Sequence, residues 1–162
     1  MSEQPIQKPE EVAAFYSEMC IGAAKQMTGR TLDYSAESIA LIESIIDQFR
    51  MDGAPTKNLS NTLVSMGCYL GEIFVRQQKG TWVWAADTPM KEVCAAPFLI
   101  QTGPTSFCNP IDKVSKRMEN GEEDSLEFFY ERFADCKIDK SAGSNWGFTA
   151  KKISWWRRLF RR

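Results

Sequence analysis

The spacing of the apolar residues changes along the chain, and this change limits the fold more than any other feature of the sequence. As far as residue 78, apolar side chains recur every three or four positions, which is typical of one face of an α-helix. From Thr81 to Trp84 the period is two, which is typical of a β-strand. Helical spacing returns after residue 109. This order predicts an α+β domain in which a small antiparallel sheet packs on several helices.

Three helices are expected before the sheet, because each apolar stripe lies between residues that favour helix ends. The first follows Pro9 and ends near Gly29. The second is capped by Ser35 and broken at residues 52–55, and the third covers about residues 59–78. Each is expected to turn its apolar stripe toward the core. In the first helix that stripe consists of Val12, Phe15, Tyr16, Met19, Cys20, Ala23 and Met27.

Two glycines lie on one face of the third predicted helix. Gly67 and Gly71 each cost about 1 kcal/mol relative to alanine in a helix interior, so their presence needs a reason. We interpret them as positions where another element approaches too closely for a Cβ atom. Contact with a ligand is the alternative.

The strands of the predicted sheet are short. They cover residues 81–84, 97–102 and 106–108, with a further ragged strand around residues 92–95. Turn-forming residues separate the second strand from the third. The pattern therefore favours hairpin connections and an antiparallel arrangement.

Two more helices are expected after the sheet. Asn109 and Pro110 begin the first of them, which ends at residues 120–121. Asp124 or Ser125 can cap the second, which carries an apolar stripe of its own. The chain thus returns to helix after the sheet.

The charges divide the chain into an acidic body and a basic tail. We expect one domain over residues 1–139, a small polar linker over 140–147 and a tail over 148–162. The formal net charge is −1, but the tail holds six basic residues and no acid, which leaves 14 basic against 21 acidic residues elsewhere. An acidic body lacks the cations that displace counterions from phosphates, so we expect no nucleic-acid binding by the main domain.

Several classes of chemistry are excluded by composition. The chain has no histidine, so it cannot form a Ser-His-Asp triad, a Cys-His pair or a histidine metal site. Its five cysteines are scattered and never spaced as Cys-x-x-Cys, so we expect buried thiols. Neither a glycine-rich phosphate loop nor a run of about 20 apolar residues occurs. We expect no catalytic residue, cofactor or metal, and a cytoplasmic location.

Four residues form a candidate surface site around the start of the sheet. Glu72 and Arg76 lie one helical turn apart and are expected to form a surface ion pair. Trp82 and Trp84 project from one face of their strand, and we favour the core for both, with an exposed binding platform as the alternative. A catalytic role for Glu72 or for the acids at residues 122–124 is a further alternative.

The tail has the clearest functional pattern in the sequence. On a helical wheel its aromatic and aliphatic side chains fall on one arc and nearly all its cations on the other. Such a helix suits the boundary of an anionic membrane, so contact with the inner membrane face is one hypothesis and packing on the acidic body is the other. The candidate contact residues are Trp155, Trp156, Arg157, Arg158, Leu159, Phe160, Arg161 and Arg162.

Four stretches of the sequence carry a resemblance to known domains. They are residues 66–72 (MGCYLGE), 80–83 (GTWV), 109–114 (NPIDKV) and 120–126 (NGEEDSL). These resemble a set of uncharacterised bacterial domains that share a glycine-containing helix, a Gly-x-Trp strand and an Asn-Pro-led helix. The resemblance covers less than half of the chain. It implies an α+β fold and, as one candidate role, an immunity protein that neutralises a toxin.

The sequence favours a non-catalytic function. The leading hypothesis is that the acidic face of the body binds a protein partner, with a basic toxin as the specific case, because complementary charge sets partner choice and encounter rate. A peripheral membrane protein anchored by its tail is the alternative. A carboxylate-based enzyme is the second alternative.

Overall fold

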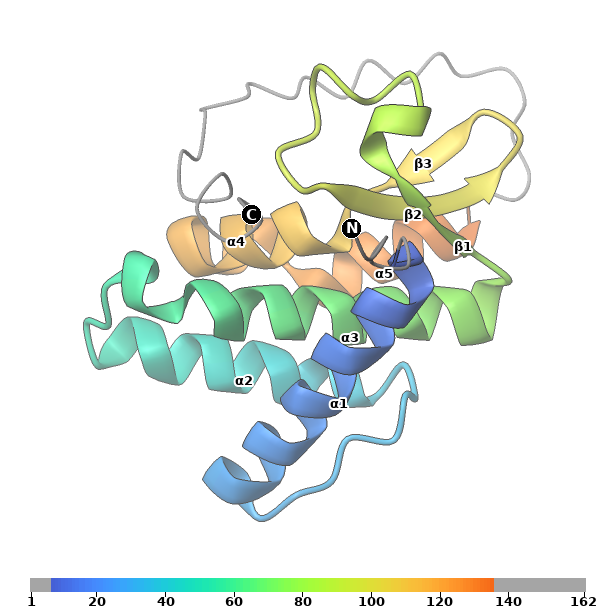
Figure 1. Ribbon diagram of the computed structural model, residues 1–162. Helices are drawn as coiled ribbons and strands as arrows, with labels where there is room; N and C mark the ends of the chain where they lie inside the picture. The colour runs from blue at the N-terminus through green and yellow to red at the C-terminus, as the bar shows by residue number, and fades with distance from the viewer. Residues whose placement is uncertain (1–6, 136–162) are drawn as a thin grey trace, which may run out of the picture.

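A computed structural model of the chain describes residues 7–135. In this part, five α-helices and a three-stranded antiparallel sheet form the α+β fold that the sequence predicts (Figure 1). The linker and tail lie outside the described residues. The helices are α1 (Pro9–Thr28), α2 (Ser38–Met51), α3 (Ser60–Gln78), α4 (Pro110–Asn120) and α5 (Leu126–Asp135), and the strands are β1 (Thr81–Trp84), β2 (Phe98–Gly103) and β3 (Ser106–Cys108).

The helix ends follow local signals in the sequence. Gly29 ends α1 in the left-handed conformation, at φ 72°. The Asn109 side chain caps α4 by accepting the backbone N–H of Asp112 at 3.0 Å. Ser35 also caps as predicted, but it accepts the N–H of Ser38 at 3.2 Å in the turn that precedes α2. Local capping chemistry thus sets these boundaries.

The sheet has the order β1-β2-β3, and the three main strands are confirmed. Ile100 of β2 lies between Trp82 of β1 and Cys108 of β3. The fourth strand predicted around residues 92–95 is wrong, because that segment forms turns and a bend. Its backbone bonds to a helix instead of a sheet, since the carboxylate of Asp112 accepts the N–H of Ala95 at 3.2 Å.

Helix α3 lies at the centre of the fold. Every residue from Leu63 to Phe74 is buried. Figure 1 shows α1 crossing α3 and α2 running beside α3. The sheet lies on the side of α3 away from α2. The core is therefore continuous from the helices to the sheet.

The two glycines of α3 mark close contacts, as predicted. A Cβ atom at Gly67 would lie 2.5 Å from the Cα of Ile111 in α4. A Cβ atom at Gly71 would lie 2.2 Å from the Trp82 ring in β1. The close-approach interpretation is confirmed, because glycine alone leaves room for these neighbours.

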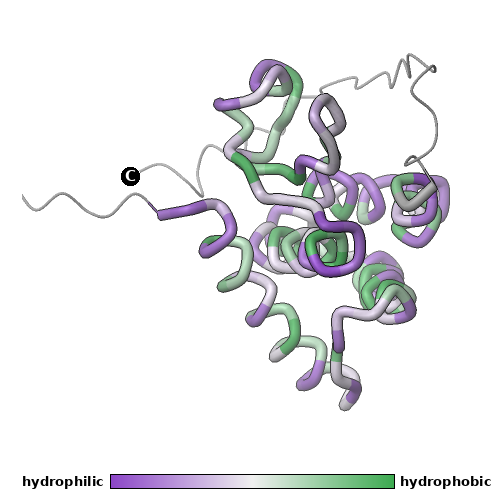
Figure 2. The backbone as a smooth tube through the Cα atoms, turned by 90° about the vertical axis from the view of Figure 1, so that its right-hand side faces the viewer, coloured by the Kyte–Doolittle hydropathy of each residue, from purple (hydrophilic) through white to green (hydrophobic). Residues whose placement is uncertain are grey.

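The stripe predicted to face inward on α1 does so only in part, because Cys20 is buried and Val12 and Tyr16 pack against the core, whereas the larger remaining side chains do not. Phe15, Met19 and Met27 are 65%, 48% and 50% exposed. The face toward α3 consists of small residues, which let the two helices approach closely and leave the larger side chains outside. Figure 2 shows α1 at the edge of the molecule. The buried residues of α1 are Ala13, Ser17, Cys20 and Ala24.

Candidate functional site

The predicted site around Glu72 is a buried contact between α3 and β1 and not a surface site. Trp82 is buried and donates its Nε1–H to Glu72 Oε1 at 2.9 Å. Glu72 is only 9% exposed. The half-exposed side chain of Arg76 places its Nε atom 3.5 Å from the second carboxylate oxygen of Glu72, Oε2. The core interpretation holds for Trp82 and in part for the half-buried Trp84, since both rings meet Phe98 edge to face. The cluster ties α3 to β1.

Arg76 also contributes to a stack of side chains that holds the connection between α1 and α2. Its guanidinium lies 3.6 Å from the centre of the Tyr34 ring, which stacks on Tyr69 at 4.9 Å. Tyr34 has a left-handed backbone, at φ 62°, and its N–H donates to the Tyr69 hydroxyl at 2.8 Å. These contacts offset the strain of that conformation. We assign them to fixing the loop.

The structure brings together three carboxylates that the sequence analysis did not single out. Glu37 lies just before α2, and Glu127 and Glu131 lie one turn apart on α5. All three side chains are exposed. They line an open groove of about 210 Å³ together with Ala36, Ile39 and Tyr130.

No described basic side chain forms an ion pair with these carboxylates. Within residues 7–135, no hydrogen bond or ion pair joins Glu37, Glu127 or Glu131 to a basic side chain. Arg132 is the next residue on α5, but its guanidinium lies over the Phe128 ring, 5.6 Å from the centroid. The groove therefore places three carboxylates beside the apolar side chains of Ala36 and Ile39 and the Tyr130 ring. Such a surface can receive a lysine or arginine side chain of a partner.

One signal in the sequence pointed toward this groove. Glu127 and Glu131 form a like-charged pair at i,i+4, which is unfavourable on an isolated helix. Glu37 carries no such signal, because it is far from both in sequence and is brought near them only when α2 packs against α5. The site could not be assembled without the tertiary structure.

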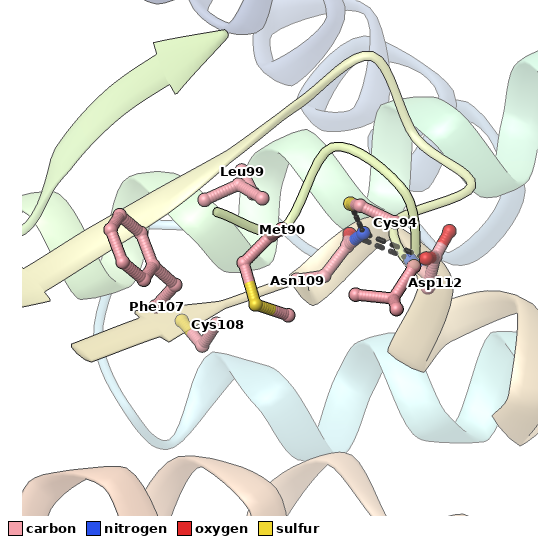
Figure 3. A pocket seen from close by; sticks show the side chains of 8 residues that line it. Met90, Cys94, Leu99, Phe107, Cys108, Asn109 and Asp112 are labelled. Atoms are coloured by element: carbon pink, nitrogen blue, oxygen red, sulfur yellow. Dashed lines mark hydrogen bonds between the residues drawn. The ribbon is translucent and has the colours of Figure 1, made fainter. Parts of the chain in front are cut away.

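A second, smaller pocket lies beside the start of α4 (Figure 3). Its volume is about 20 Å³, which is enough for one water molecule and too small for a substrate. Asn109 donates its amide to Asp112 Oδ2 and to Cys94 Sγ, both at 2.7 Å. Asp112 Oδ1 is buried without a partner.

Burial shifts the pKa values of two titratable groups in this pocket. Burial raises the pKa of Cys94 to about 12, so its thiol stays protonated and is a poor nucleophile near neutrality. Burial also raises the pKa of Asp112 to about 6. The described residues contain no group of three or more histidine, cysteine, aspartate or glutamate side chains placed to hold a metal ion. We assign the cluster to holding the 85–97 loop on α4.

Arg117 is another buried charge that the sequence analysis missed. Its guanidinium donates to Glu43 at 3.3 Å and to Asp47 at 2.9 Å, which joins α4 to α2. The signal was its position, three residues after Val114 on the apolar face of α4. Glu43 also accepts the N–H of Leu126 at the start of α5. The role of Arg117 is structural.

The fold and groove define a small α+β domain with an acidic, concave surface. The family described as "Domain of unknown function (DUF3806)" matches residues 39–130, which is more than half of the chain and covers most of the described fold from α2 to α5. The chain belongs to this family. Neither α1 nor the tail lies in the matched range. No curated protein and no solved structure matches the chain. Among the described helices, none has the length and apolar character needed to span a membrane.

Proposed function

We propose that this chain is a non-catalytic binding domain whose acidic groove receives a basic surface of a partner protein. The observation that carries the proposal is the gathering of Glu37, Glu127 and Glu131 around one groove, which no basic side chain of residues 7–135 lines. The acidic excess of the body adds long-range attraction for a basic partner. A toxin with a basic surface is the specific partner that the family resemblance suggests, and the chain would then be an immunity protein.

The structure gives less support to carboxylate-based catalysis. Glu72 is buried and bonded to Trp82, so it does not line the groove. Asp124 accepts hydrogen bonds from Lys113 and Asn120, both at 2.6 Å, and thereby stabilises the turn before α5. These acids have structural partners, and this leaves the groove as the stronger candidate for function.

The groove is tested by capturing partners from the source organism with the full chain. The groove variant carries Glu37→Lys, Glu127→Lys and Glu131→Lys. The matched control carries the same charge change at three other exposed acids, Asp87, Glu92 and Glu119. We expect a stoichiometric partner that the wild type and control retain and the groove variant loses. Equal capture by all three chains, or no stoichiometric partner, would contradict the proposal.

A second candidate function is association with an anionic membrane through the tail. The observation in its favour is the sequence pattern, in which Trp155, Trp156 and Phe160 oppose the tail arginines. The test compares flotation of the full chain with that of a Trp155→Ser, Trp156→Ser variant, using vesicles of phosphatidylserine and phosphatidylcholine. The wild type should float with the vesicles and the variant should not. Equal recovery would rule this function out.

A further inference from the structure

The exposed side of α1 carries a stripe with the spacing of a coiled-coil seam, and the first three positions of this stripe are apolar. Val12, Phe15, Met19, Gly22 and Gln26 follow one another at alternating steps of three and four residues. At 100° per residue they fall within an arc of about 80°. All except the half-buried Val12 are exposed, and the opposite face of the helix packs on α3. The stripe is therefore a second face that a helical partner fits.

The middle of this stripe combines a protruding side chain with an open notch. Phe15 is 65% exposed, and a Cβ atom built on Gly22 would have no neighbour within 4 Å. When two such helices run antiparallel and are centred between Glu18 and Met19, Phe15 of each copy lies opposite Gly22 of the other. A large side chain then enters the space that a glycine leaves, as in knobs-into-holes packing.

The charges beside the stripe are self-complementary in the same register. Glu11, Glu18 and Lys25 lie seven residues apart along one flank of the stripe. Antiparallel pairing brings Glu11 of one copy near Lys25 of the other, and the two-fold axis produces this pair twice. Glu18 meets its own copy near the axis, but its carboxylate already accepts the Tyr34 hydroxyl at 3.0 Å. Opposite charges thus outnumber like charges.

We propose that α1 forms the interface of a homodimer, in which two copies of the chain pack α1 against α1 in antiparallel orientation. None of the groove residues lies on α1, so each copy keeps its own groove. The dimer presents two grooves and binds a repetitive partner more tightly by avidity. The inference stands apart from the proposed function, because it rests on α1 alone.

The dimer is tested by sedimentation equilibrium of the full chain over a range of concentrations. We expect a monomer–dimer equilibrium, which Met19→Lys weakens by at least about tenfold, because it places two cations in an apolar seam. The matched control is Met51→Lys, since Met51 is 81% exposed at the end of α2. It should leave the equilibrium unchanged. A monomer at every concentration, or equal effects of the two variants, would overturn the proposal.

Charge exchange tests the antiparallel register. Glu11→Lys and Lys25→Glu should each weaken the dimer, and the double variant should recover most of the loss, because opposite charges face each other again. Circular dichroism melting shows whether each variant is folded. A double variant as weak as the single ones would contradict the register.

The tail is the competing occupant of the stripe. If the wild type is a monomer and the Trp155→Ser, Trp156→Ser variant dimerises, the tail covers α1 within one chain and the proposal is overturned. Dimerisation of both chains supports it.

Discussion

At the scale of single residues, the fold depends on positions where a side chain is missing or a charge is buried. Gly71 leaves the space that the Trp82 ring fills, and the next residue, Glu72, accepts the hydrogen bond of that ring. The sequence predicted the close approach, because a glycine in a helix interior needs a compensating contact. It did not predict the bond, since a glutamate one turn before an arginine resembles an ordinary surface pair.

Gly71→Ala should therefore destabilise the fold. The new Cβ would overlap the Trp82 ring, and the resulting displacement should cost about 1–3 kcal/mol of the free energy of unfolding, despite the better helix propensity of alanine. Gly22→Ala is the control, because that position is open, and it should stabilise by up to about 1 kcal/mol. Urea unfolding at low protein concentration measures both. Equal effects of the two substitutions would refute this account of α3.

Asp112 should make stability depend on pH. Burial raises its pKa from 3.8 in the unfolded chain to about 6 in the folded protein, so the folded state binds the proton more tightly. The contribution of Asp112 is then greatest below pH 3.8 and is lost as pH rises through about 6. Urea unfolding at pH 4 and pH 7 should show that the wild type loses stability relative to Asp112→Asn at the higher pH. A constant difference, or the opposite sign, would contradict the assignment.

At the scale of helices and strands, local sequence signals predict where helices end, but they do not predict which face of a helix packs inward. Gly29, Asn109 and Ser125 act at helix ends as predicted, because capping involves only neighbouring residues. The inward face of α1 was predicted only in part, since periodicity places Phe15 and Met19 on one stripe with the buried Cys20 without showing where that stripe leaves the core. Tertiary packing selected the small residues of α1 instead.

The tie between α2 and α4 gives a prediction at this scale. Arg117→Met should lower the free energy of unfolding by about 3 kcal/mol, because it leaves Glu43, whose side chain is only 14% exposed, without its cation. Asp47→Asn should cost less than about 1 kcal/mol, since the Asp47 side chain is 44% exposed. Thermal or urea unfolding of both variants measures the difference. Similar losses of stability in the two variants would mean that Arg117 stabilises the fold mainly through the exposed Asp47, which would contradict this prediction.

At the scale of the whole molecule, the α+β class was predictable because the spacing of apolar residues along the sequence changes from a helical period to a strand period and back. The groove was not, because Glu37 and the two glutamates of α5 belong to separate segments that meet only through packing. Composition did give the sign of the charge that the groove carries. A predictable fold thus carries a site that only tertiary packing assembles.

A titration of the labelled full chain with an arginine-rich peptide, followed by nuclear magnetic resonance, tests the binding site most directly. The peptide stands for the basic surface of a partner. We expect amide shifts that cluster at Glu37, Glu127 and Glu131, leave Glu92 and Glu119 unchanged, and disappear at high salt, because screening weakens exposed charges. Shifts spread evenly over the acidic surface, or centred away from α2 and α5, would contradict the groove as the binding site.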